Sequence, residues 1–306
     1  MKRFIIQIIA LFFITAIVDF ASGIIFDYLQ AHVKGGATYR DNYICNELDS
    51  DILMVGSSRC EHHYNPIIFE DTFGKSCYNA GQSGNGIIVA YARVMMVCER
   101  RKPELVIYDL NPDFDLLLGY DNHRYLTWLK SYYDKDYVKQ IFETIDPKEK
   151  YKMMSLMYRY NSRFIEILVD YLHPSTDNSL QGYIPFNSDM DKTKIDAKEM
   201  SVDKGPYTFD QVKLSYIEKL IEAVGSNNLI ITISPRWYGL DQASYRPLVD
   251  ICRNNKIRFI DYSNDPKYVH NDFYFKDGTH LNARGADEFT KDLIDTLNII
   301  SENEKN

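Results

Sequence analysis

The chain has 306 residues, of which 45% are hydrophobic and 25% are charged, and its formal net charge at pH 7 is −8. This composition is that of a globular protein and excludes a disordered chain, and the length allows one large domain or two modest ones. The acidic balance and the lack of a Lys/Arg-rich tract argue against nucleic acid as a partner. The 24 tyrosines favour a half-buried core, and a tyrosine surface that stacks on carbohydrate rings is the alternative.

The most apolar segment lies at the N-terminus. From Phe4 to Phe26 the only charged residue is Asp19. At about 1.5 Å per helical residue, this run is long enough to cross a hydrocarbon core of about 30 Å. Asp19 falls in the outer third of the run, where a carboxylate can reach the membrane interface. We therefore predict a membrane-spanning signal anchor over residues 1–27.

The charges around this run predict its orientation. Lys2 and Arg3 precede the run, and no comparable positive charge directly follows it. The N-terminus is therefore expected to stay in the cytoplasm, which makes the chain a single-pass protein of the cell membrane with an extracytoplasmic domain. A cleaved signal peptide is one alternative, although Phe20-Ala21-Ser22 places a bulky residue at the outer position of a small-x-small site. A buried helix is the other alternative.

Beyond the anchor, short apolar runs alternate with helical patterns. Strands are predicted at residues 51–56, 76–80, 104–110, 228–234 and 256–262. Helices are predicted over residues 84–100, over about 208–224, and through Phe289, Leu293 and Leu297. The second of these helices opens on a capping box from Thr208 to Gln211. Strands that alternate with helices predict an α/β fold in three layers, in which helices cover both faces of a parallel sheet.

The segment between the third and fourth strands, residues 112–225, is far longer than one crossover helix requires. Tyrosine-rich helical stretches are predicted within it at residues 124–145 and 148–172. We interpret the segment as an insertion that forms a lid or substrate wall within a single domain of residues 28–300, without a core of its own. Residues 301–306 are expected to form a disordered tail.

Polar residues that follow the strands are candidate site residues, because ligands of parallel α/β sheets bind beyond the carboxyl ends of the strands. After the first strand, Gly56-Ser57-Ser58-Arg59 would expose a serine hydroxyl that a base could activate as a nucleophile. The same pattern also suits a turn followed by a helix cap. Arg59 is expected either to pair with a carboxylate or to orient an anionic substrate.

The second strand is followed by the glycine-bearing loop Asn79-Ala80-Gly81-Gln82-Ser83-Gly84. Glycines let a backbone approach a ligand closely, and the N–H groups that open the next helix can face a negative charge. A flexible turn is the alternative. The loop lacks the Lys-Ser/Thr ending of a P-loop and misses the spacing of the dinucleotide fingerprint, so we expect no cofactor.

A turn before the last helix contains Asp277, Gly278 and His280. An Asp three residues before a His can accept the ring N–H, fix the tautomer and stabilise the imidazolium formed during proton transfer. The other Asp-x-x-His of the chain runs from Asp170 to His173. It lies at the end of a predicted helix, where a His commonly interacts with the helix C-terminus.

Cys60-Glu61-His62-His63 contains four potential zinc ligands. Consecutive residues rarely converge on one ion, so we expect no metal, and we expect one of the two histidines to border an acyl pocket next to Ser58. Cys60 as the nucleophile is an alternative, disfavoured because it lies beyond the tight turn. The chain has five cysteines, an odd number without the C-x-x-C spacing of zinc or redox sites.

The order of these features resembles the SGNH (GDSL-type) hydrolase superfamily. The resemblance covers about residues 51–298 and implies a flavodoxin-like hydrolase fold. It also implies that Ser58 is the nucleophile, His280 the general base and Asp277 its carboxylate partner. Gly56-Ser57-Ser58 in place of the family's Gly-Asp-Ser is similar to the variant of membrane-anchored envelope O-acetylation proteins.

The resemblance further implies an oxyanion hole formed by the N–H groups of Ser58 and Gly84 and by an asparagine side chain. The family's Gly-x-Asn-Asp segment is missing, and Leu110-Asn111-Pro112-Asp113 occupies its place, so Asn111 is the best substitute. The expected activity is that of a serine esterase or O-acyltransferase acting on acyl esters of envelope glycans, with acetyl as the first candidate. The expected partner is thus an acylated carbohydrate or another ester. The alternative is a non-catalytic glycan-binding or scaffold protein of the cell envelope with the same fold.

Overall fold

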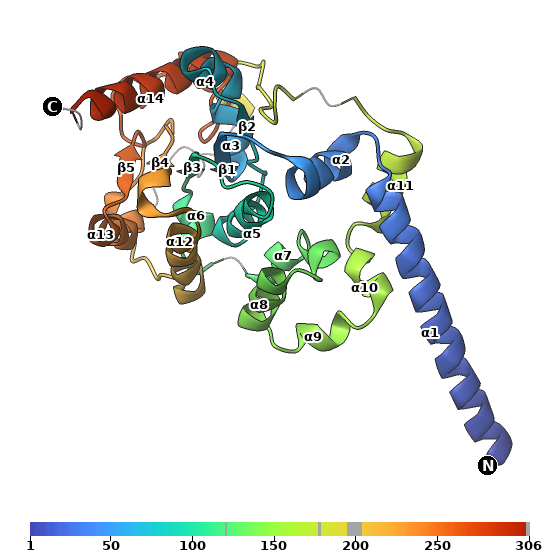
Figure 1. The fold of residues 1–306 in the computed structure, drawn as a ribbon. Coiled ribbons are helices and arrows are strands. Elements are labelled where there is room, and N and C mark those ends of the chain that lie inside the picture. The colour runs from blue at the N-terminus through green and yellow to red at the C-terminus, as the bar shows by residue number, and fades with distance from the viewer. Residues whose placement is uncertain (120, 177–178, 195–203, 304–306) are drawn as a thin grey trace. The chain divides into compact units, whose positions relative to one another are not determined.

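The computed structural model describes residues 1–119, 121–176, 179–194 and 204–303 (Figure 1). The chain divides into two compact units: unit 1 is Met1–Glu47 with Asp121–Asp177, and unit 2 is Leu48–Tyr120 with Asn178–Asn306. The insertion predicted over residues 112–225 is therefore not one structural block. Its middle part belongs to unit 1, and its two ends belong to unit 2.

Unit 2 is built on a five-stranded parallel sheet with the order β2-β1-β3-β4-β5. The strands are β1 (Ile52–Gly56), β2 (Cys77–Asn79), β3 (Leu105–Asp109), β4 (Leu229–Ile233) and β5 (Arg258–Asp261). Every residue of β1 and β4 is buried, as expected for strands that helices cover on both faces. Each strand lies within its predicted segment, and the strand order is that of flavodoxin-like folds, so the predicted α/β fold is confirmed.

Two layers of helices cover this sheet (Figure 1). One layer consists of α3 (Ser58–His63), α4 (Pro66–Phe73) and α14 (Ala283–Asn303), and the other of α5 (Ile87–Cys98), α12 (Gln211–Val224) and α13 (Arg246–Asn255). The short helix α6 (Pro112–Asp115) follows β3. Helix α14 buries Phe289, Leu293 and Leu297, which form the predicted core stripe.

Two helix ends differ from the prediction. The cap of α12 is Asp210, whose carboxylate accepts the N–H groups of Val212 and Lys213, so the capping box predicted from Thr208 is wrong. Helix α14 continues to Asn303, into the segment predicted as a tail from residue 301, and residues 304–306 lie outside the described residues.

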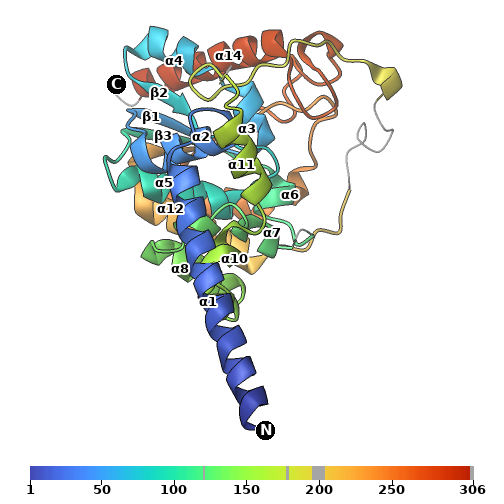
Figure 2. The same cartoon turned by 90° about the vertical axis from the view of Figure 1, so that its right-hand side faces the viewer.

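Unit 1 combines one long helix with several short ones. These are α1 (Lys2–Ala31), α2 (Gly36–Asn42), α7 (His123–Leu126), α8 (Asp136–Ile145), α9 (Glu149–Lys152), α10 (Leu156–Tyr160) and α11 (Phe164–Leu172). Helix α1 packs against α10 and α11 (Figure 2). Among the described residues, α1 is the one helix that is long and apolar enough to cross a membrane, a property that signal sequences share.

Candidate active site

The turn after β1 presents Ser58 as the first residue of α3. Gly56 lies beside Asp109 of the neighbouring strand. A Cβ atom at Gly56 would lie 2.6 Å from the carbonyl oxygen of Asp109 and 2.8 Å from the Cβ of Cys60. Only glycine allows this close packing, which holds the turn and therefore the position of Ser58.

The structure brings Ser58, His280 and Asp277 together. The Oγ of Ser58 lies 2.9 Å from the Nε2 of His280, across 222 positions of sequence. The Nδ1 of His280 lies 3.0 Å from each carboxylate oxygen of Asp277. All three side chains are partly exposed and can be reached by a ligand. In this geometry a histidine can take the proton of a serine while a carboxylate orients its ring.

The turn before α14 holds Asp277 in its charged form. The carboxylate accepts the backbone N–H groups of Thr279 and His280, both at 2.8 Å. Burial by itself raises the pKa of Asp277, but the hydrogen bond and charge of His280, together with these N–H groups, outweigh it and lower the pKa to about 2. Asp277 is thus ionised at neutral pH and keeps a proton on Nδ1 of His280, which leaves Nε2 to accept from Ser58.

His63 and His62 both lie near His280 but make different contacts. The buried Nε2 of His63 accepts the N–H of Leu281 at 3.0 Å, and its Nδ1 lies 3.0 Å from the Oγ of Ser234. Burial, followed by the charge of His280, lowers the pKa of His63 well below its usual value, so the ring is neutral. His63 therefore supports the residue next to His280.

His62 and Phe186 flank the catalytic candidate His280. The ring centroid of His62 lies 5.8 Å from that of His280, and the ring centroid of Phe186 lies 5.7 Å from it. The His62 and Phe186 rings contact each other at 3.9 Å between centroids. Of the two histidines considered for the border of an acyl pocket, His62 is the one that forms an aromatic wall with a neighbouring ring.

The glycine-bearing loop after β2 is tied to α3. One carboxylate oxygen of Glu61 accepts both the N–H of Ser83, at 3.0 Å, and its hydroxyl, at 2.5 Å. Gly84 follows with a φ of +75°, a left-handed conformation that favours glycine. The predicted residue Gly84 thus belongs to a loop that is anchored to the helix beginning at Ser58.

Asn111, which the family resemblance pointed to, lies just beyond the end of β3. Its Oδ1 accepts the N–H of Asp113 at 3.3 Å and the Nη2 of Arg236 at 2.7 Å. Because Oδ1 is engaged by two donors, the Nδ2 amino group is the donor that Asn111 can offer to a ligand. Arg236 is 4% exposed and was not among the predicted site residues. It follows β4 by three positions, so the rule applied to the other strands also points to it.

Arg59 takes the first of its two expected roles. Its guanidinium lies 3.8 Å from the carboxylate of Asp109, and both side chains are buried. It also donates to the carbonyl oxygens of Leu110 and Ser234. Arg59 therefore joins the carboxyl ends of β1, β3 and β4, and burial removes it from contact with an anionic substrate.

The alternative chemistries are not supported by the geometry of their residues. Cys60 is fully buried and its Sγ donates to the Oδ1 of Asn79 at 3.5 Å. Glu61 and His62 lie 3.6 Å apart and share Ser83 as a partner, whereas Cys60 and His63 turn to Asn79 and Ser234. Among the described residues, these four do not bring three potential ligand atoms within 4.8 Å of one another. None of the five cysteines, all of which the structure describes, forms a disulfide.

The second Asp-x-x-His pair lies in unit 1, where Asp170 accepts the N–H of Thr38 at 3.0 Å. A group that the sequence analysis did not single out, His123 with Asp146 and Glu149, has potential ligand atoms within 4.8 Å of one another in the same unit. The Glu149 carboxylate, however, also binds Lys152. Neither group contains a residue of the Ser58 site.

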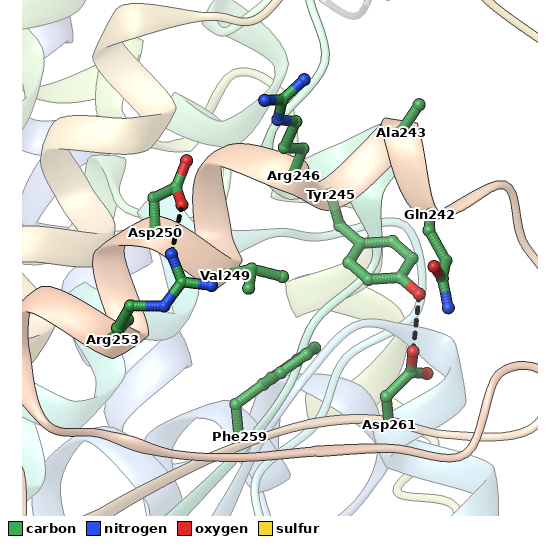
Figure 3. Close-up of a pocket in the computed structure, with 9 residues that line it drawn as sticks. All are labelled: Gln242, Ala243, Tyr245, Arg246, Val249, Asp250, Arg253, Phe259 and Asp261. Atoms are coloured by element: carbon green, nitrogen blue, oxygen red, sulfur yellow. Dashed lines mark hydrogen bonds and ion pairs between the residues drawn. The ribbon is translucent and has the colours of Figure 1, made fainter.

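A pocket of about 560 Å³ lies beside the edge strand β5 (Figure 3). Its wall includes Tyr245, whose hydroxyl donates to Asp261 at 2.6 Å, and an ion pair between Arg253 and Asp250 at 3.2 Å. Because its lining includes none of the predicted site residues, we do not assign this pocket to the Ser58 site.

Comparison with known proteins adds little to this geometry. No protein-family model and no curated protein matches the chain. The chain is similar to a crystal structure described as that of "a putative acylhydrolase" from Bacteroides fragilis NCTC 9343, with 12% sequence identity and a TM-score of 0.37. The alignment covers 89% of this chain and 95% of that chain. A TM-score this low supports no inference, so the chemistry of this chain has to come from its own residues.

Proposed function

We propose that this protein is a serine hydrolase of SGNH type that acts on ester bonds, as an esterase or an O-acyltransferase, and that α1 anchors it with unit 2 outside the cytoplasm. One observation carries the proposal: Ser58 Oγ lies 2.9 Å from His280 Nε2, while His280 Nδ1 lies 3.0 Å from Asp277. A serine hydroxyl is a weak nucleophile until a base removes its proton, and this arrangement supplies the base.

In the proposed reaction, Ser58 Oγ attacks the carbonyl carbon of the ester while His280 Nε2 takes the hydroxyl proton. Asp277 stabilises the imidazolium that forms. His280 then gives the proton to the leaving alcohol oxygen, and the acyl group stays on Ser58. Water or a sugar hydroxyl attacks this acyl group in turn, His280 takes its proton, and Ser58 is restored.

The oxyanion of the tetrahedral intermediate would be held by the N–H groups of Ser58 and Gly84 and by the Nδ2 of Asn111. Donors that are already oriented toward developing charge are among the largest contributions to catalysis. The contact of Arg236 with Asn111 Oδ1 supports this assignment, because it keeps the amide oriented with its amino group as the free donor. The substrate class that we propose is acyl esters of envelope glycans, with acetyl first, from the Gly56-Ser57-Ser58 resemblance.

The test is labelling of the purified full-length protein with a fluorophosphonate probe. Ser57→Ala is the matched control, because the Ser57 hydroxyl is fully buried and has no hydrogen-bond partner among the described residues. We expect Ser58→Ala to abolish labelling and Ser57→Ala to preserve it. Labelling that persists in Ser58→Ala would contradict the proposal.

The acceptor is identified by supplying an acetyl ester with and without a glycan that has free hydroxyls. Release of acetate alone identifies an esterase, and transfer of label to the glycan identifies an acyltransferase. A protein that binds the glycan, turns over no ester between about pH 6 and pH 9, and keeps its cellular role in His280→Ala is a scaffold instead.

A further inference from the structure

Helix α11 of unit 1 exposes its apolar side chains. Phe164, Ile165, Leu168, Val169 and Leu172 are between 41% and 63% exposed. At about 100° per residue, these positions form one continuous face of the helix. A surface helix of a water-soluble domain normally turns such a face inward.

The opposite face of α11 buries Ile167 and carries polar side chains that make contacts within unit 1. Asp170 accepts the N–H of Thr38. Arg163, at the N-terminal cap of the helix, pairs with Asp41 at 2.8 Å and with Glu166 at 2.7 Å. The side chains of Arg163 and Asp41 are less than one-tenth exposed. These contacts turn that side of α11 toward the interior of unit 1, so the exposed apolar side chains face outward.

The exposed apolar surface extends beyond α11. Met154, which precedes α10, is 77% exposed, and Met157 of α10 is also exposed. We name as the apolar face the seven residues Met154, Met157, Phe164, Ile165, Leu168, Val169 and Leu172. A cluster of this size on a protein surface marks an interaction site.

The apolar face is continuous with the candidate membrane span. The carboxylate of Asp19 in α1 accepts the N–H groups of Leu156 and Met157 at 2.9 and 3.2 Å and binds the hydroxyl of Ser155. About 10 Å further along α1, at 1.5 Å per residue, the ring of Phe26 contacts those of Tyr160 and Phe164. Helix α10 and the start of α11 therefore lie beside the part of α1 that belongs to its apolar run (Figure 2).

Two further contacts show how closely α1 is built into the unit. A Cβ atom at Gly23 would clash with the Cβ of Leu156, so the backbones of α1 and α10 pack closely here. The hydroxyl of Tyr160 donates to Asp27. Both carboxylates of the outer half of α1, Asp19 and Asp27, thus have hydrogen-bond donors from the α10 segment, as a charge beside lipid requires.

We propose that the apolar face is inserted into the same lipid bilayer as α1, so that unit 1 is held by a membrane span and by an interfacial surface beside it. Interfacial helices bury their apolar side about 5–10 Å into the boundary between headgroups and acyl chains. The contacts of Asp19 and Phe26 place α10 and the start of α11 beside the last part of the apolar run of α1. The inference rests on the membrane span proposed for α1 and is independent of the reaction proposed for Ser58.

The test uses the full chain reconstituted in vesicles of phosphatidylcholine and phosphatidylglycerol. Cys98 is the one native cysteine that is not buried, so Cys98→Ser is the background. Ile165→Cys and Val169→Cys are labelled with a fluorophore that responds to polarity. Gln140→Cys in α8 of the same unit and Ile299→Cys in α14, both exposed positions, are the matched controls.

We expect blue-shifted emission at positions 165 and 169, quenching by nitroxides on the lipid acyl chains, and protection from iodide. At the two control positions we expect emission typical of water, no quenching by the lipid nitroxides, and quenching by iodide. Iodide quenching at 165 and 169 equal to that of the controls would overturn the proposal. Protection from both iodide and the lipid nitroxides would also overturn it, because it would identify a protein, such as a second copy of this chain, as the occupant.

Discussion

Unit 2 and unit 1 both bury ion pairs but differ in the apolar side chains that they expose. In the described part of unit 2, exposed large apolar side chains are scattered singly, as Leu118, Leu180, Phe273 and Ile299. Its buried polar groups, such as Arg59, gather at the carboxyl end of the sheet. Unit 1 buries the ion pair of Arg163 and Asp41 and exposes the apolar face.

The proposed membrane insertion explains the difference as an adaptation of one chain to two surroundings. In water, burial of apolar surface stabilises the fold, and polar side chains can stay outside. Beside lipid that driving force is absent, and hydrogen bonding of polar groups inside the protein becomes the stronger requirement. The contrast therefore predicts that chemistry and membrane contact can be altered separately.

We expect His280→Ala to produce the largest loss of activity without a change in membrane contact. This change removes the base for Ser58 and should lower kcat for ester hydrolysis by about 10⁴-fold or more. The fluorescence of a label at position 165 in vesicles should stay as in the parent protein. Hydrolysis assays and emission spectra on the same preparation measure kcat and the fluorescence at position 165. A change in that fluorescence would show that activity and membrane contact are coupled.

A smaller loss, about 10²–10³-fold in kcat, is expected from Asn111→Ala, because the oxyanion loses one donor. Asn111→Asp is the matched variant: it keeps an acceptor for Arg236 and for the N–H of Asp113 but has no Nδ2 donor. Steady-state kinetics should show the same or a larger loss for Asn111→Asp. If either variant keeps the parental kcat, Asn111 does not bind the oxyanion and serves only as the N-terminal cap of α6.

Gly23→Leu tests the other unit. Because there is no room for a side chain against Leu156, we expect it to destabilise the packing of α1 on α10 by about 1–3 kcal/mol. Limited proteolysis should then cut residues 151–172 faster, with fluorophosphonate labelling of Ser58 unchanged. Ala21→Leu, at an exposed position of α1, is the control and should behave as the parent. Equal proteolysis of both variants would argue against the helix contact.

The smallest effect concerns a carboxyl that unit 2 buries near the proposed oxyanion hole. Asp115 accepts the N–H groups of Asn111 and Ile87 at 2.6 and 2.7 Å. Burial raises its pKa to about 7, although these N–H groups and the side chain of Tyr108 act in the opposite direction. The folded state therefore keeps a proton on Asp115 that the unfolded state has already lost at pH 5.5.

The free energy of unfolding should consequently fall by about 1 kcal/mol between pH 5.5 and pH 6.5. Asp115→Asn has no such proton and should lack this part of the decline. Chemical denaturation of both proteins at the two pH values measures the difference. An identical decline in the variant would assign the pH dependence to another group.

Much of the site could be predicted because it depends on local pattern and on one general rule. Apolar runs predicted all five strands, and the rule that ligands bind at the carboxyl ends of parallel strands led to the segments that follow them. The resemblance to the SGNH hydrolases then singled out Ser58, Gly84 and Asn111 within those segments. The spacing of Asp277 and His280 within one turn was equally visible. What the pattern did not reveal was Arg236 beside Asn111 or the support of the His280 turn by His63. Each of these contacts joins residues more than 100 positions apart.

By itself, the sequence determined that the chain begins with an apolar helix and continues as alternating strands and helices, because both features follow from the periodicity of neighbouring residues. The helical stretch predicted over residues 148–172 contains α11, whose residues form an apolar side. Only the tertiary structure decided that this side faces outward. Periodicity shows that a helix has two faces, but which face is buried depends on its partners, here Asp41 and Thr38, far away in the sequence.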